Sequence, residues 1–220
     1  IAGANNFYVI SRSSNMLRPR IIPCLLIHNG GLVKTTGFSD AKYVGDPINA
    51  VRIFNEKEAD ELMVLDIDAT VAGNEPDFTL IAKLAAECRM PLCYGGGINS
   101  VEQVERLVNI GVEKVAISSA AVARPKLVTE VADAVGRQSV AAVLDVRKRI
   151  GVLSTKYTIC THNAKKSYKV NLLSLVQELQ QAGVGEIIVN SVDRDGMMKG
   201  YDLDLAAQVR SVAEVPLTFL

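Results

Sequence analysis

The chain has 220 residues, and its 24 lysines and arginines balance 24 aspartates and glutamates. This length suits one sizeable core, so a single α/β domain is favoured over two. The charge balance argues against nucleic acid or an anionic membrane as partner, and no apolar run approaches the ~20 residues that a membrane helix needs. We therefore expect a soluble cytoplasmic protein with a small-molecule or protein partner.

Four cysteines occur without a CxxC pair or metal-finger spacing, and two of them, Cys24 and Cys93, lie inside apolar runs. Buried thiols of this kind are typical of a reducing compartment. We expect no disulfides, no metal site and no cofactor.

From residue 20 onward, short apolar runs alternate with longer amphipathic stretches, a pattern that predicts parallel strands joined by crossover helices. Each run is largely apolar, as in strands buried on both faces. The seven predicted strands cover residues 20–27, 61–67, 91–94, 114–117, 139–144, 186–190 and 216–220.

Helix boundaries are marked between these strands. Asp46 precedes a proline, residues 100–103 read as a capping box, and Pro125 can open a helix. Gly111 and Gly183 are expected to end helices.

The sequence around residues 61–68 is similar to that around 186–195, and residues 23–26 are similar to 142–145. We therefore expect a (β/α)8 TIM barrel of two half-barrel repeats. Residues 1–15 are expected to be a non-native or disordered leader, and residues 16–220 a barrel that is incomplete after its seventh strand.

Parallel barrels place their sites at the carboxyl ends of the strands. Gly95, Gly96 and Gly97 follow the third strand, and Ser118 and Ser119 follow the fourth. Bare backbone N–H groups beside two hydroxyls could bind a phosphate. The alternatives are a tight turn at the glycines and simple helix caps at the serines.

Carboxylates follow other strands. Asp193 and Asp195 lie past the sixth strand and Asp145 past the fifth, so all three could converge on one mouth, where crowding would raise the pKa of one carboxyl and suit it to act as an acid. The alternative is solvated loop carboxylates.

Asp66 and Asp68 end the second strand, and Lys34, after the flexible Asn29-Gly30-Gly31, could clamp an anion or simply face solvent. His28 and His162 are expected in loops, unpaired and facing solvent.

Four charged residues precede strands at the opposite end, namely Arg20, Glu61, Lys114 and Glu186. Two acids and two bases placed in this way could form a salt-bridged ring that closes the bottom of the barrel. The alternative is four independent surface charges.

These residues together resemble the cyclase subunit of imidazole glycerol phosphate synthase, the HisF family, from about Met16 to Pro216. The resemblance lies in Arg20-Ile-Ile-Pro-Cys-Leu, Val64-Leu-Asp-Ile-Asp-Ala, Tyr94-Gly-Gly-Gly-Ile, Ile117-Ser-Ser-Ala-Ala and, most specifically, Ser191-Val-Asp-Arg-Asp-Gly. It implies a barrel that docks a HisH-like glutaminase at its bottom, passes ammonia through a charged gate and binds a phosphorylated small molecule at its top.

The resemblance also implies residue roles. Asp195 matches the general acid, Asp145 a supporting aspartate, and the ring the ammonia gate. The binding positions implied by the resemblance or by strand-end placement are Lys34, Asp66, Gly96, Gly97, Ser118, Ser119 and Gly196. Ser118 replaces the usual asparagine, and the second phosphate cup would follow Leu220.

The general-base aspartate of the family is replaced by Leu26, and losing such a base typically costs about 10²–10⁴-fold in rate. Residues 25–35 resemble the HisF-like branch associated with surface-polysaccharide sugar amidation, which implies ammonia delivery to a sugar amidotransferase. The alternatives are the histidine-pathway cyclase and a non-catalytic activator of the glutaminase.

Overall fold

A computed structural model describes residues 19–150 and 155–220. The leader expected over residues 1–15 lies outside this part. No helix in the described ranges is long and apolar enough to cross a membrane.

Seven strands run parallel in one curved sheet, in the order β11-β10-β7-β6-β5-β4-β1. All seven predicted strands are confirmed. Their bounds are β1 Cys24–His28, β4 Leu62–Asp66, β5 Leu92–Gly95, β6 Lys114–Ile117, β7 Val140–Ile150, β10 Glu186–Ser191 and β11 Leu217–Phe219.

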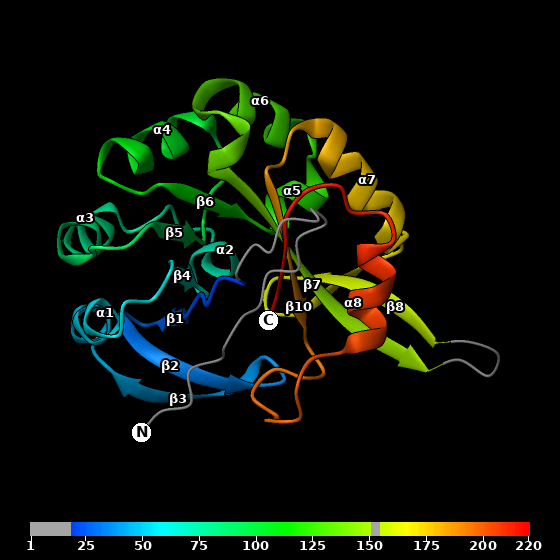
Figure 1. The fold of residues 1–220 in the computed structure, drawn as a ribbon, viewed down its shortest axis with the longest axis horizontal. Coiled ribbons are helices and arrows are strands. Elements are labelled where there is room, and N and C mark those ends of the chain that lie inside the picture. The colour runs from blue at the N-terminus through cyan, green and yellow to red at the C-terminus, as the bar shows by residue number, and fades with distance from the viewer. Residues whose placement is uncertain (1–18, 151–154) are drawn as a thin grey trace.

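The longer helices lie on the outer side of the sheet, whereas the short helices Ala69–Ala72 and Ser119–Ala123 lie nearer its centre, so the described residues form an α/β half-barrel of the predicted TIM-barrel type (Figure 1). Valine, leucine and isoleucine side chains fill the space between sheet and helices. The helices are α1 Pro47–Glu56, α2 Ala69–Ala72, α3 Phe78–Glu87, α4 Val101–Asn109, α5 Ser119–Ala123, α6 Lys126–Val135, α7 Leu172–Ala182 and α8 Leu203–Arg210, with a short 3₁₀ turn at Arg137–Ser139.

The predicted helix boundaries agree with the structure. The Asp46 carboxylate accepts from the backbone N–H of Asn49 and caps α1, and Gly183 ends α7 in the left-handed conformation. Ser100 caps α4, but Gln103 accepts from the N–H of Asn99 rather than from Ser100. In the predicted capping box, the side chain of Gln103 therefore binds the N–H of the residue before the N-cap rather than the N–H of the N-cap itself.

Two antiparallel extensions were not predicted. β1 continues into β2 Gly31–Thr36 and β3 Ser39–Gly45, whereas β7 continues into β8 Thr155–Thr161 and β9 Lys166–Tyr168. The first strand of each half thus carries its own pair of extra strands. This symmetry supports two half-barrel repeats (Figure 1). The similarity of residues 23–26 to residues 142–145 makes Leu26 of β1 the counterpart of Asp145 of β7.

The hydroxyl of Tyr94, in β5, is buried without a hydrogen-bond partner in the described part of the chain, whereas the hydroxyl of Tyr157, in β8, donates to Asp202. An unpaired buried polar group costs about 1–3 kcal/mol. We predict that Tyr94→Phe leaves the free energy of unfolding unchanged or raises it by up to that amount. Tyr157→Phe should lower it by about 1 kcal/mol or more.

Urea denaturation of the two variants checks this pair. A loss of more than 1 kcal/mol in Tyr94→Phe, as large as that in Tyr157→Phe, would show that the Tyr94 hydroxyl is satisfied after all.

Candidate functional site

Four charged side chains form a closed ring at the amino-terminal end of the strands. Arg20 contacts Glu61 Oε2 at 2.6 Å through Nη1 and Glu186 Oε1 at 3.0 Å through Nη2. Lys114 Nζ lies 2.9 Å from Glu61 Oε1 and 2.7 Å from Glu186 Oε2. Each cation bridges both carboxylates, so the alternative of independent surface charges is wrong.

The ring is largely removed from solvent, because Glu61 is only 3% exposed and Glu186 only 4%. Burial raises the pKa of Glu61. Burial also acts to raise the pKa of Glu186, but the charge of Lys114 and the hydrogen bonds to this carboxyl outweigh it and hold the pKa below its usual value. The pKa values of the two ring carboxyls are therefore shifted in opposite directions.

Apolar side chains line the barrel axis above the ring. The cluster comprises Ile22, Met63, Cys93, Ala116, Ala141, Val143 and Ile188, with Cys24, Leu65 and Leu220 packed against it. Cys24, Leu65, Ala116, Val143 and Leu220 also line a cavity at the carboxyl ends of the strands. The ring, the apolar axis and the cavity therefore follow one another along the barrel.

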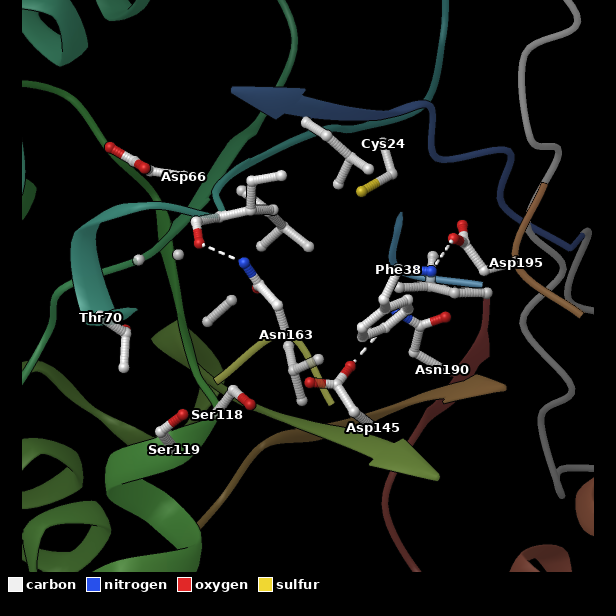
Figure 2. Close-up of a pocket in the computed structure, with 18 of the residues that line it drawn as sticks. Cys24, Phe38, Asp66, Thr70, Ser118, Ser119, Asp145, Asn163, Asn190 and Asp195 are labelled. Atoms are coloured by element: carbon white, nitrogen blue, oxygen red, sulfur yellow. Dashed lines mark hydrogen bonds between the residues drawn. The ribbon is translucent and has the colours of Figure 1, made fainter. Parts of the chain in front are cut away.

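The cavity has a volume of about 480 Å³ and is lined by strand ends from β1 to β10 (Figure 2). It brings together most of the predicted site residues. These are Leu26, Asp66, Gly96, Gly97, Ser118, Ser119, Asp145, Asp195 and Gly196.

Asp145 is the carboxyl with the most altered acidity. Burial, followed by the nearby charge of Asp195, raises its pKa to about 7, although hydrogen bonds from Asn190 and Ser118 act in the opposite direction. The Asn190 amide donates to Asp145 Oδ1 at 3.2 Å (Figure 2). The expected effect of crowding is present but second to burial, and the raised carboxyl is Asp145 rather than the acid that the resemblance implied.

Asp195 is held by the unpredicted hairpin β2–β3. Its Oδ2 accepts from the Thr35 hydroxyl at 2.8 Å and from the Phe38 N–H at 2.9 Å (Figure 2). The Gly37 N–H donates to the Asp195 carbonyl. The β-branched residues Val33, Thr35 and Thr36 are the sequence signal that could have revealed β2.

Asp193 and Lys34 do not join the cavity. Asp193 is exposed and accepts from the N–H of Lys148 at 2.6 Å, so the predicted convergence of three carboxylates loses this member. Lys34 is exposed on β2, because neighbouring residues of a strand face opposite sides and Thr35 faces inward. The cavity's third carboxylate is Asp66 instead.

The prediction that both histidines lie unpaired in solvent-facing loops was wrong for His28, and for His162 only its loop position, between β8 and β9, is confirmed. His28 ends β1 and its Nδ1 lies 2.7 Å from Asp68 Oδ1, so it is paired rather than free. His162 lines the cavity, where burial and Lys166 lower its pKa. The neighbouring Asn163, which sequence reasoning missed, donates across the cavity to the Ile67 carbonyl at 2.9 Å.

Gly96 and Gly97 are required by their surroundings. Both have positive φ, and a Cβ would approach the Asp66 carbonyl oxygen to 2.5 Å at Gly96 and the Asn74 carbonyl oxygen to 2.6 Å at Gly97. The Gly97 N–H already donates to Thr70 Oγ1. The tight-turn alternative thus accounts for these glycines, and phosphate binding stays a prediction.

Asp66 serves the same local turn. Its Oδ1 accepts from the N–H groups of Asp68 and Ala69, and burial raises its pKa. Ser118 occupies the N-cap position of α5, but its side chain makes no capping hydrogen bond and instead lines the cavity, where it acts to lower the pKa of Asp145. The helix-cap alternative is therefore wrong for Ser118.

β1 presents only neutral side chains to the cavity. Leu26 lies there in register with Leu65, and Cys24 lies two residues earlier. Burial, with the charges of Asp195 and Asp145, raises the pKa of the Cys24 thiol to about 12. Neither residue can take up a proton near neutral pH, so the cavity has no base on this strand.

Comparison with known proteins agrees with this architecture. Residues 20–219 match the model of the family described as "Histidine biosynthesis protein". A Vibrio vulnificus relative, provisionally named imidazole glycerol phosphate synthase subunit hisF3, is 53% identical over 94% of this chain and 79% of its own.

A Leptospira borgpetersenii relative with the provisional name imidazole glycerol phosphate synthase subunit HisF is 51% identical over 93% of this chain and 80% of its own. The imidazole glycerol phosphate synthase subunit HisF of Frankia casuarinae is 37% identical over 90% of this chain and 78% of its own. The chain therefore belongs to the histidine biosynthesis protein family and, within it, to the HisF family.

Proposed function

We propose that this chain docks a HisH-like glutaminase at the amino-terminal end of its strands and passes ammonia through the barrel axis. The observation that carries this proposal is the complete ring of Arg20, Glu61, Lys114 and Glu186 beneath an apolar axis. Buried charges are costly when they are unpaired, so the four residues stay paired and keep the ring closed. A second protein docked on the ring could offer these charges other partners and so open it.

Ammonia is the ligand that suits this axis. Apolar surroundings strongly disfavour ions but cost a small neutral molecule much less. Neutral ammonia that crosses the ring therefore meets a cluster from Met63 to Val143 that does not retain it, and then the cavity. A charged ammonium ion would be stopped at the ring.

Leu26 decides what happens to the ammonia. Ring closure in the family's cyclase reaction needs a general base that leucine cannot supply, and β1 offers no substitute. We infer that the ammonia passes to a separate sugar amidotransferase acting on a nucleotide-linked surface-polysaccharide sugar. The resemblance of residues 25–35 to that branch supports this destination.

A second function, the cyclase reaction itself, is favoured by one observation. Asp145 and Asp195 still share the cavity, and the raised pKa of Asp145, about 7, suits a group that gives and takes protons near neutral pH. Under this alternative Asp66 or Asp145 would have to act as the base.

The first test uses the ring. Mixed with a HisH-type glutaminase, the chain should raise the rate of glutamine hydrolysis. Glu61→Gln should reduce that stimulation by about tenfold or more, because it weakens charge-assisted hydrogen bonds worth about 1.5–3 kcal/mol. Lys126→Gln, on an exposed lysine of α6, is the matched control. Absence of a complex, or equal stimulation by Glu61→Gln and the control, would contradict the gate.

The second test uses Leu26. With ammonium supplied at alkaline pH and the family's cyclase substrate, the native chain should show little turnover, and Leu26→Asp should raise it by about 10²–10⁴-fold. Product formation by chromatography measures both. Efficient turnover by the native chain would instead establish the cyclase function and show that the base lies elsewhere.

The third test uses the acidity of Asp145. Its folded pKa of about 7 exceeds the usual 3.8, so the charged form penalises the folded state, and stability is lost as pH rises from about 4 through 7. We predict that the free energy of unfolding of Asp145→Asn, compared with that of the native chain, is higher at pH 8 than at pH 4 by up to about 4 kcal/mol.

Urea denaturation at both pH values measures this difference, with Asp133→Asn, on the exposed side of α6, as the control. The same difference at both pH values would show that the pKa of Asp145 is not raised in the folded chain and that Asp145 is not a neutral-pH acid.

A further inference from the structure

A fifth polar side chain touches the ring from inside the barrel. Thr218, in β11, is fully buried, and its hydroxyl donates to Glu186 Oε1 at 2.6 Å. Its sequence neighbours Leu217 and Phe219 belong to the core between sheet and helices. Because side chains alternate along a strand, Thr218 faces the opposite side, toward the barrel axis.

The pairing register agrees with this placement. Thr218 stands opposite Ile188 of β10, and adjacent in-register residues of a sheet share a face. Ile188 belongs to the apolar axial cluster. Within the described residues, that cluster consists of aliphatic and sulfur-containing side chains. Thr218 therefore places a hydroxyl beside side chains that carry none.

This contact makes the ring asymmetric. Glu186 accepts from Arg20, from Lys114 and from the uncharged Thr218, which is part of the sheet. Glu61 accepts only from the two cations in the contacts of the described residues. The Thr218 bond is one of the influences that lower the pKa of Glu186, whereas the pKa of Glu61 is raised.

We infer that Thr218 is a fifth member of the ring, a positioning residue that fixes Glu186 to β11 so that the ring opens by movement at Glu61. The gate role rests on the proposed function, but the positioning of Glu186 does not. Arg20, with a side chain 34% exposed, is the more accessible cation and can follow Glu61, whereas the Lys114 side chain is only 14% exposed.

The first experiment needs no partner protein. Thr218→Val keeps the shape of the side chain but cannot donate, whereas Thr218→Ser keeps the hydroxyl. Carbon-13 NMR of the glutamate carboxyls follows the titration of Glu61 and Glu186 as pH changes. The neighbouring charged or titratable residues, Arg20, Lys114 and Cys93, are the same in every variant. The pKa of Glu186 should rise in Thr218→Val and return in Thr218→Ser, with a smaller effect on Glu61.

The same spectra report motion. Relaxation dispersion in the native chain should show exchange at the Glu61 carboxyl and not at Glu186, and Thr218→Val should add exchange at Glu186. If Thr218→Val does not fold, Thr218→Ala removes the hydroxyl without placing a methyl against Glu186, and the same changes are expected. An unaltered Glu186 in a folded variant would overturn the inference.

The second experiment adds a HisH-type glutaminase. Thr218→Val should lower glutaminase stimulation by about tenfold relative to Thr218→Ser, the factor expected for one hydrogen bond to a charged group, with the Kd of the complex unchanged. Equal stimulation by the two variants would overturn the role in gating. No stimulation by the native chain would defeat the proposed function, while the NMR result would still decide whether Thr218 positions Glu186.

Discussion

The ring of alternating charges at the amino-terminal end of the strands is the constraint on which the rest of the structure depends. Two nearly buried carboxylates, Glu61 and Glu186, face each other only because Arg20 and Lys114 bridge them. Removing one partner of a buried ion pair typically costs about 3–5 kcal/mol, so the four residues must stay together. They come from separate points of the chain, and holding them in one ring requires the sheet to curve.

That curvature sets the chemistry at the other end. It turns the carboxyl ends of the parallel strands toward one cavity, where Asp66, Asp145 and Asp195 lie together with Arg194 and Lys199 of the loop after β10. Burial then raises the pKa of Asp145, while the hairpin β2–β3 supplies two donors to Asp195. Similar carboxyls thus acquire different properties from their surroundings. The strand that carries Leu26 contributes no carboxyl to the cavity.

Much of this arrangement could be predicted from the sequence. The apolar runs are long enough to identify seven strands, and charged residues placed just before four of them indicated the ring. The predictions failed where a local pattern was short or where a contact joined distant segments. Lys34 is among the predicted binding positions, but the alternation of side chains along β2 turns it outward, as its solvent-facing alternative has it.

Tertiary contacts explain the remaining differences. Asp193 and Asp195 are two residues apart, and only the packing of their loop against β7 and the β2–β3 hairpin separates an exposed carboxylate from one in the cavity. The reach of Asn163 to the Ile67 carbonyl joins residues 96 positions apart. The burial that raises the pKa of Asp145 likewise depends on the assembled cavity rather than on its neighbours in sequence.

The central claim is that the charged end of the barrel is the face that meets a glutaminase. Hydrogen–deuterium exchange of this chain, alone and with a HisH-type glutaminase, tests it most directly. We expect slower exchange in the segments around Arg20, Glu61 and Lys114, with the cavity loop around Asp195 unchanged. Protection confined to the cavity loops, or none at either end, would contradict it.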